Sequence, residues 1–439
     1  MNKEILRIAL PSIAQNVTVP LLGFADTAIS GHLGGAEYIG AVAVGGMVFN
    51  MLYWLCAFLR MSTGGLTAQA FGRAADGELA PLLLRALRIG LFISLAILVL
   101  QVPLGRVALR FFDASPDVEQ LAGVYYSILV WGAPAVLMSY GLAGWFLGSQ
   151  DARTPMVVAV VQNVLNILLS LFFVIVLGWR VEGVAAGTLI AQWAGLLMYL
   201  FAVPRYAREY LLRSLKLVTR HSSLVTRQCS LVPSHGRVEL MLFLRTLCMV
   251  SVQIFFTRLG AAQGAVVLAA NAVLLQFYML FSYFMDGFAY AGEAVGGKYF
   301  GAQDRGSFVR LVKHLFLWGT GLTLLFTLLY YFSGAGLLQL LTDDDGVVAT
   351  AVEYLPYDSL MPLWGVAAFL FDGLCVGTTS TRLLLASVVF GMIAFFAVVF
   401  LPASLTNDVL WLAMLAFLVV RGIVQAVFVR TLLPCPVCR

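Results

Sequence analysis

Asp26 is a lone carboxylate in an apolar stretch that runs from Pro20 to Gly31 (PLLGFADTAISG). An ionised carboxylate in bilayer hydrocarbon costs at least ~2.5 kcal/mol, so intramembrane acids usually face a cavity and act there. Burial favours the neutral form of a carboxyl group, which allows it to bind and release protons near neutral pH. Pro20 removes a backbone donor and weakens the helix about one turn before the acid. This combination favours a transporter; the alternative is an Asp26 that serves helix packing alone.

Three further polar residues lie in a later apolar stretch, VQNVLNILLSLFF. Asn163, Asn166 and Ser170 are three and four residues apart, so a helix places them on one face. Buried amides and hydroxyls require hydrogen-bond partners. With Asp26 they form a candidate ion-coupling site for a proton or a small hard cation such as Na⁺. A polar seam that only joins helices is the alternative.

The second half of the chain has its own acids. Asp286 and Glu293 are seven residues apart in FMDGFAYAGEAVGGKYFG and therefore share a helix face, while Asp372 lies in FLFDGLCVG. These three acids are candidates for attracting a cationic substrate or for coupling. Static ion pairs with Arg245 or Arg258 are an equally good interpretation of the same residues.

The elements that must position these residues are membrane-spanning helices. Hydrophobic residues make up 61% of the chain and charged residues 11%, against about 25% charged residues in soluble domains. About 20 apolar residues cross ~30 Å of hydrocarbon as a helix. The sequence predicts an all-α integral membrane protein with twelve such helices, centred near residues 18, 53, 97, 131, 166, 193, 250, 280, 321, 364, 391 and 420.

The basic residues predict the orientation. With the N-terminus in the cytoplasm, only four of the 27 Lys and Arg fall outside (Arg106, Arg110, Arg180 and Arg258) and three lie within spans (Arg60, Arg245 and Arg421). The remaining 20 are cytoplasmic. We therefore expect a multi-pass protein of the inner (plasma) membrane with both termini in the cytoplasm. The formal charge of +5 reflects this topology and does not indicate nucleic-acid binding.

The chain repeats itself at a constant offset of 229 residues. Phe71-Gly72 recurs as Phe300-Gly301, and the same offset relates six further pairs: Val118/Val347, Ala122/Ala351, Tyr125/Tyr354, Gly144/Gly373, Gly148/Gly377 and Arg153/Arg382. Two halves of six spans each enter from the same side, so they are predicted to form two parallel-repeat bundles. The expected domains are an N-terminal lobe at 1–204, a basic cytoplasmic linker at 205–237, a C-terminal lobe at 238–434 and a tail at 435–439.

Other functions fit the sequence poorly. The segment from Gly292 to Lys298 has the spacing of a phosphate-binding loop, but Tyr299 follows where Ser or Thr is needed. No ATPase module is apparent, and the His and Cys residues lack metal-ligand spacing, including Cys435 and Cys438 in the tail. A membrane enzyme, such as a prenyltransferase or a protease, lacks its paired acidic clusters or dyad. We expect no enzymatic activity, no metal and no cofactor.

Five motifs resemble the multidrug and toxic compound extrusion (MATE) family, in particular its DinF-like branch. They are ADTAISGHLG at 25–34, FLGSQDARTPM at 146–156, VEGVAAGTLIAQ at 181–192, FMDGFAYAGEAVGGKYFGAQ at 284–303 and FLFDGLCVGTTSTR at 369–382. The resemblance covers nearly all of the chain except about 207–238 and the last residues. It implies two six-helix lobes that form a V when open and that export organic cations or other amphipathic compounds in exchange for H⁺ or Na⁺.

The same resemblance implies roles for individual residues. Asp26 matches the principal coupling acid of the first helix, whose protonation is proposed to bend that helix. Asn166 matches the asparagine of the fifth helix, and Asp286, Glu293 and Asp372 match acids of the C-terminal lobe. Many family members have an Asp where this chain has Ser170, which favours H⁺ over Na⁺. A flippase for a lipid-linked precursor is the alternative; substrate and oligomeric state are not predicted.

Overall fold

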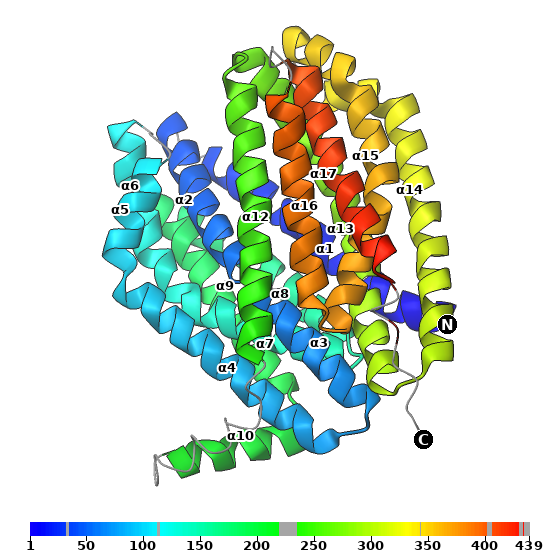
Figure 1. Cartoon of the computed structure of the whole chain (residues 1–439). Coiled ribbons are helices and arrows are strands. Elements are labelled where there is room, and N and C mark those ends of the chain that lie inside the picture. The colour runs from blue at the N-terminus through cyan, green and yellow to red at the C-terminus, as the bar shows by residue number, and fades with distance from the viewer. Residues whose placement is uncertain are drawn as a thin grey trace. The chain divides into compact units, whose positions relative to one another are not determined.

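The computed structural model describes residues 1–31, 35–111, 115–218, 235–342, 344–401, 406–429 and 433. Every regular element within these ranges is helical, as predicted (Figure 1). Within the part of the chain that the structure describes, twelve spans are long and apolar enough to cross a membrane. All twelve predicted centres fall within them: Asn2–Gly31, Glu37–Gly72, Gly77–Val99, Pro116–Gly148, Arg153–Val176, Val181–Ala202, Gly236–Ala261, Ala265–Gly301, Arg305–Leu341, Asp345–Gly377, Thr381–Phe400 and Asn407–Val427.

Several spans consist of more than one helix. In the first half the helices are α1 (Asn2–Gly31), α2 (Ala36–Leu55), α3 (Phe58–Gly72), α4 (Asp76–Val99), α5 (Gln101–Phe111), α6 (Pro116–Leu129), η1 (Val130–Gly132), α7 (Ala133–Gly148), α8 (Arg153–Leu171), η2 (Phe172–Val176) and α9 (Val181–Ala202). The second span thus joins α2 to α3 through Cys56 and Ala57. The fifth ends in the π-helical turn η2, directly after the polar residues of α8.

The second half contains longer continuous helices. They are α12 (His235–Ala261), α13 (Ala265–Gly301), α14 (Arg305–Leu341), α15 (Asp345–Gly377), α16 (Thr381–Phe400) and α17 (Asn407–Val427). Between the halves lies α10 (Arg205–Val218), inside the predicted linker. The rest of that linker up to residue 234, and the Cys435–Cys438 tail, lie outside the described residues.

The chain divides into two compact units. The N-terminal unit comprises Ala14–His235, and the C-terminal unit comprises Gly236–Arg439 together with Met1–Ile13. The predicted N-terminal lobe at 1–204 included the first thirteen residues, whereas the structure groups them with the C-terminal unit. Side-chain contacts explain this grouping. Glu4 accepts hydrogen bonds from Lys298 (3.1 Å) and from Tyr299 (2.8 Å). The division between the units therefore falls within α1, between Pro11 and Pro20.

The repeated glycines mark equivalent helix crossings in the two units. In the N-terminal unit, a Cβ atom at Gly148 would collide with the backbone of Gly64, where α7 crosses α3. In the C-terminal unit, a Cβ atom at Gly377 would collide with the backbone of Glu293, where α15 crosses α13. Both members of each pair are related by the 229-residue offset. Small residues allow such close approach between membrane helices, so the repeat preserves a packing contact.

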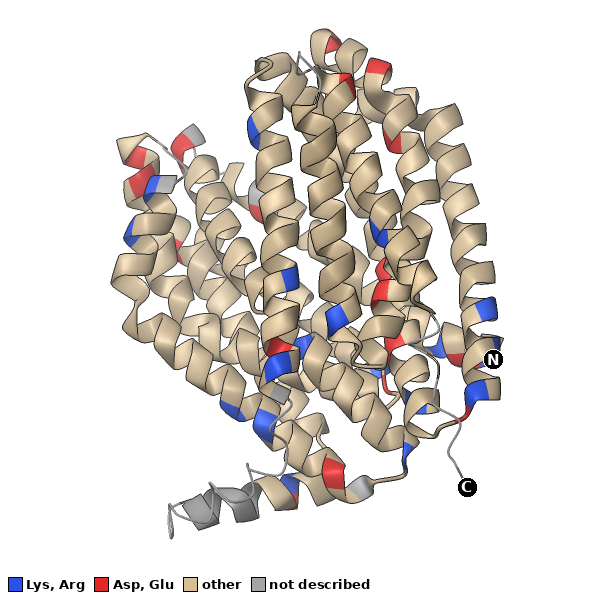
Figure 2. Ribbon diagram, viewed as in Figure 1, with Lys and Arg blue, Asp and Glu red and all other residues tan. Residues whose placement is uncertain are grey.

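The surfaces of both units suit a membrane. Long stretches of helix carry no Lys, Arg, Asp or Glu, and the charged residues gather mainly near helix ends (Figure 2). Large apolar side chains are exposed in the spans, for example Phe92, Phe332 and Phe400. Exposed apolar side chains are costly in water but face hydrocarbon favourably in a bilayer. The few charges that lie within the helix bundles therefore stand out as functional candidates.

Candidate functional site

Asp26 lies in the N-terminal unit, in the part of α1 that follows Pro20. Its Oδ1 atom is buried, and no donor in the described ranges forms a hydrogen bond with it. Ser30 donates to the backbone carbonyl of Asp26 (2.7 Å), not to its carboxylate. Pro20 has no backbone N–H and therefore cannot donate to the carbonyl four residues earlier in α1. The structure thus places Asp26 on the same continuous helix as Pro20.

Asn163 holds α8 against α1. Its side-chain amide donates to the hydroxyl of Thr18 (2.9 Å) and to the carbonyl of Thr18 (3.3 Å). Thr18 lies two residues before Pro20 and about two helical turns before Asp26. The amide therefore contacts the weakened part of α1 and has no hydrogen bond with the acid.

Asn166 and Ser170 belong to a short polar chain between α8 and α9. The Ser170 hydroxyl donates to Asn166 Oδ1 (3.2 Å), and the Asn166 amide donates to the Thr188 hydroxyl (3.1 Å). Thr188 also shares a hydrogen bond with Tyr125 of α6, and Tyr125 lies close enough to Asp26 for the two side chains to interact electrostatically. The structure thus links these two predicted residues to the neighbourhood of Asp26 through Tyr125 and Thr188.

Tyr125 and Thr188 were not predicted as site residues. Tyr125 was visible in the sequence only as a repeat partner of Tyr354, and Thr188 only as part of a family motif. Neither signal indicates a polar contact, because helical spacing does not show which helices pack together.

In the C-terminal unit, Glu293 and Asp286 both lie on α13. Glu293 is buried, with 1% of its surface exposed, at the crossing with α15 near Gly377. Asp286 is half-buried and interacts electrostatically with Tyr278 and Tyr283. The two acids share a helix as predicted, and they lie in different surroundings.

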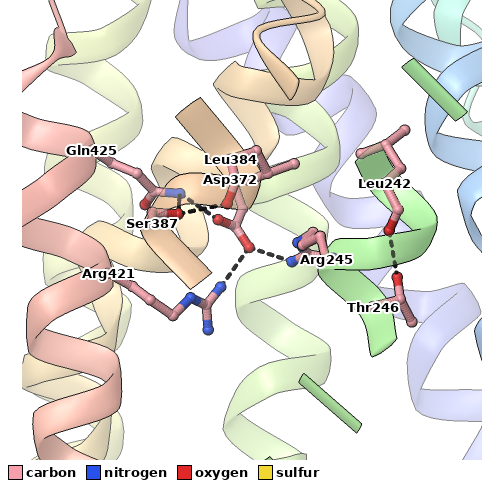
Figure 3. Close-up of polar contacts among 8 residues, drawn as sticks. All are labelled: Leu242, Arg245, Thr246, Asp372, Leu384, Ser387, Arg421 and Gln425. Carbon is pink, nitrogen blue, oxygen red and sulfur yellow. Dashed lines mark hydrogen bonds and ion pairs between the residues drawn. The ribbon is translucent and has the colours of Figure 1, made fainter. Parts of the chain in front are cut away.

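Asp372 is the centre of a buried ionic cluster (Figure 3). Its Oδ2 atom accepts hydrogen bonds from Arg245 of α12 and from Arg421 of α17, the latter at 2.7 Å. Its Oδ1 atom accepts from Gln425 (2.6 Å), which also donates to Ser387 of α16 (3.1 Å). Three helices therefore meet at one carboxylate, and α16 joins them through Gln425.

The cluster carries a surplus positive charge. Two guanidinium groups share one carboxylate, and the Nε atoms of Arg245 and Arg421 are buried without an acceptor in the described part of the chain. Asp372 thus forms static ion pairs, one of the two interpretations of the sequence. Its partners are Arg245, as suggested, and Arg421 instead of Arg258. As a paired carboxylate it is poorly suited to attract a cationic substrate by itself.

Asp358 is a buried acid that the sequence interpretation missed. It lies on α15 between Pro356 and Pro362 and is 0% exposed. The available signal was an acid close to prolines in an apolar span, the same pattern that identified Asp26.

Comparisons with known proteins agree with this architecture. The MatE family model matches residues 11–172 and 240–401; the two matches are offset by 229 residues (240 − 11), the period of the internal repeat. DNA damage-inducible protein F of Escherichia coli is 35% identical over 98% of this chain and 92% of its own length. A probable multidrug resistance protein NorM of Thermotoga maritima is 27% identical over 45% of this chain and 44% of its own length.

A solved structure shows the same fold. The Vibrio cholerae MATE transporter VcmN in its bent form is 18% identical, with a TM-score of 0.83 over 98% of this chain and 96% of that one. The family match covers both halves of the chain, and the match to the Escherichia coli protein spans nearly its whole length. The chain therefore belongs to the MatE family of multi-pass membrane transporters, and within it to the DinF-like branch.

Proposed function

We propose that this protein is a secondary active exporter of amphipathic or cationic organic compounds in the plasma membrane, with both termini in the cytoplasm. Export is driven by antiport with H⁺, and protonation of Asp26 is the coupling event. The transport cycle requires neither a catalysed reaction nor a resident cofactor. The Asp26 carboxylate carries this proposal, because its buried Oδ1 has no donor among the described residues. A relative that is named a probable multidrug resistance protein supports the substrate class.

The surroundings of Asp26 support a proton as the coupling ion. Ser170, the position where a second acid would strengthen a Na⁺ site, supplies a neutral hydroxyl whose hydrogen bond goes to Asn166. The Asn166 amide is in turn bonded to Thr188. A buried carboxyl oxygen without a donor favours the protonated form of the acid. It therefore responds to the proton gradient by changing its charge in place.

The position of Asp26 on α1 couples that charge to conformation. Pro20 has no backbone N–H to contribute to the helical ladder of α1, and the division between the two units falls at Ile13 and Ala14 on the same helix. A charge change on α1 therefore acts on the helix that belongs to both units. Protonation and substrate affinity are then linked reciprocally, as any coupling requires.

Transport in proteoliposomes tests the proposal. Efflux of a fluorescent lipophilic cation is measured under an imposed proton gradient and, separately, under an imposed sodium gradient. We expect movement under the proton gradient alone, loss of that movement in Asp26→Asn, and normal rates in Asp117→Asn, which removes an exposed carboxylate at the start of α6. Movement driven by sodium alone, or undiminished transport by Asp26→Asn, contradicts the coupling mechanism. Silence under both gradients contradicts export of cations and favours a lipid-linked substrate.

A further inference from the structure

Among the acids that the structure describes in the C-terminal unit, Asp358 has both carboxylate oxygens buried without a hydrogen-bond partner in the described ranges. It is 0% exposed. Asp372 lies fourteen residues later on the same helix, α15, or about 21 Å along its axis, and has two arginines and a glutamine as partners. An ionised carboxylate that is buried without partners costs several kcal/mol, so in this conformation Asp358 is stable only as the neutral acid.

The neighbouring titratable groups do not supply a countercharge. Tyr278 on α13 and Tyr330 on α14 are the tyrosines that interact electrostatically with Asp358. The Tyr330 hydroxyl donates to the Phe277 carbonyl (2.7 Å), so its proton is directed away from the acid. Tyr278 carries no charge at neutral pH.

Charged groups on α17 and α13 interact with Tyr278 and Tyr357, which lie next to Asp358 in space or in sequence. Arg421 of α17 interacts with Tyr278 but forms its ion pair with Asp372. Asp408 of α17 accepts a hydrogen bond from Tyr357 (3.0 Å), and Asp286 of α13 acts on Tyr278. Both of these acids carry the same sign of charge as an ionised Asp358, so neither supplies it with a countercharge.

The helix that carries Asp358 is weakened at that position. Pro362 cannot donate to the backbone carbonyl of Asp358, and Pro356 lies two residues before the acid. Across the interface with α14, Gly319 packs against Leu370 and Gly334 packs against Leu355, which places Thr327 at the level of Pro362. The Thr327 hydroxyl is buried and, like Asp358, has no partner in the described residues. The Asp358 carboxyl group and its backbone carbonyl therefore lie within about one helical turn of Pro362, and Thr327 lies at the level of that proline on α14.

We propose that Asp358 is a second proton-binding site, within the C-terminal unit, and that its charge controls the bending of α15 at Pro362. A proton from solvent binds a carboxylate oxygen and gives the neutral acid, which fits the closed packing of α14 against α15. Release of that proton leaves an anion that needs donors such as the Thr327 hydroxyl or water, and the helix pair must open at Pro362 to provide them. This role in the transport cycle rests on the proton-coupled export proposed above.

Infrared difference spectroscopy tests the site without requiring transport. Spectra of the reconstituted protein are recorded across a pH series, and the carbonyl band of the neutral acid is assigned as the band that is lost in Asp358→Asn. We expect this band to decrease as pH rises and to remain in Asp408→Asn, the matched control on α17. Asparagine imitates the neutral acid, so Asp358→Asn should fold; Asp358→Leu provides a second variant. A band that is absent, or that does not change with pH, overturns the proposal.

Proton counting separates this proposal from the role of Asp26. The number of protons exchanged per substrate is measured from the gradient that just balances transport. We expect Asp358→Asn to slow export, because asparagine cannot release a proton to open the helix pair, and to remove a single proton from the ratio in the export that remains; Asp26→Asn instead abolishes proton-driven export. An unchanged ratio in Asp358→Asn overturns the second site and leaves the proposed function intact. If Asp26→Asn still exports under a proton gradient while the Asp358 band still changes with pH, only the proposed coupling role of Asp26 is overturned.

Discussion

The guanidinium group of Arg421 lies 2.7 Å from Oδ2 of Asp372, and both residues are buried in the C-terminal unit. The same oxygen accepts a hydrogen bond from Arg245. Removing one partner of a buried pair is far more harmful than replacing the pair as a whole, because the remaining charge has no compensation. The charges of these three residues compensate one another in part, so the loss of folding stability should differ from one substitution to the next.

Asp372→Asn is expected to destabilise the C-terminal unit by about 3–5 kcal/mol, because two positive charges then lie close together without an anion. Arg245→Gln should cost less, since Arg421 and Asp372 still balance. Thermal unfolding in detergent measures both, and the Arg245→Gln/Asp372→Asn double variant should recover part of the loss. A double variant that is no more stable than Asp372→Asn would show that charge balance is not the cause.

The glycine crossings lead to a second prediction. A Cβ atom at Gly373 would overlap the backbone of Ala289, which cannot move aside as a flexible side chain can. Gly373→Ala should therefore destabilise the protein by about 1–3 kcal/mol. Gly336 on α14 is the matched control because nothing lies within 4 Å of the added atom. Gly336→Ala should be neutral or stabilising by up to about 1 kcal/mol, and equal destabilisation by both substitutions contradicts the close crossing.

Sequence periodicity was sufficient for the helices and for the repeat, but not for the partners of the polar residues. Apolar length alone identifies the spans, and the 229-residue offset identifies equivalent glycines such as Gly148 and Gly377. The partners of Asp372 come from α12 and α17, 127 and 49 residues away in sequence. Which helix faces meet depends on side-chain packing across the whole bundle. For the same reason Asn163 could be assigned to a polar face while its contact with Thr18 could not be predicted.

The start of α14 has a pH-dependent cap. Hydrogen bonds from Ser307 to the carboxylate of Asp304 lower the pKa of that acid below its ordinary value. A lowered pKa in the folded state means that the cap contributes stability above the pKa of the unfolded chain, about 3.9, and loses it as pH falls through the folded pKa. Asp304→Asn should keep the cap and abolish this dependence. Hydrogen exchange of the Ser307 amide, corrected for intrinsic rates, measures it; an unchanged pH dependence in Asp304→Asn would exclude this carboxylate as its source.

The polar chain of α8 allows its two possible roles, helix joining and ion coupling, to be separated. Ser170→Ala removes the donor to Asn166 Oδ1, and Asn166→Leu removes the acceptor of Ser170 together with the donor to Thr188. Each single substitution leaves a buried polar group without its partner, at a cost of about 1–3 kcal/mol. The double variant should cost less than the sum of the two, because groups in one hydrogen-bonded chain are not independent.

Transport by the same variants shows which role applies to each residue. If the hydrogen bonds among Ser170, Asn166 and Thr188 only join α8 to α9, export rates fall in proportion to the amount of folded protein recovered. The dependence of export on the proton gradient then stays the same. We expect this result for Ser170→Ala. For Asn166→Leu we expect a further change in the pH at which export is half-maximal. Asn166 is hydrogen-bonded to Thr188, which bonds with Tyr125, and Tyr125 interacts electrostatically with Asp26. An unshifted pH profile in Asn166→Leu would assign Asn166 to helix joining and leave Asp26 as the coupling group of the N-terminal unit.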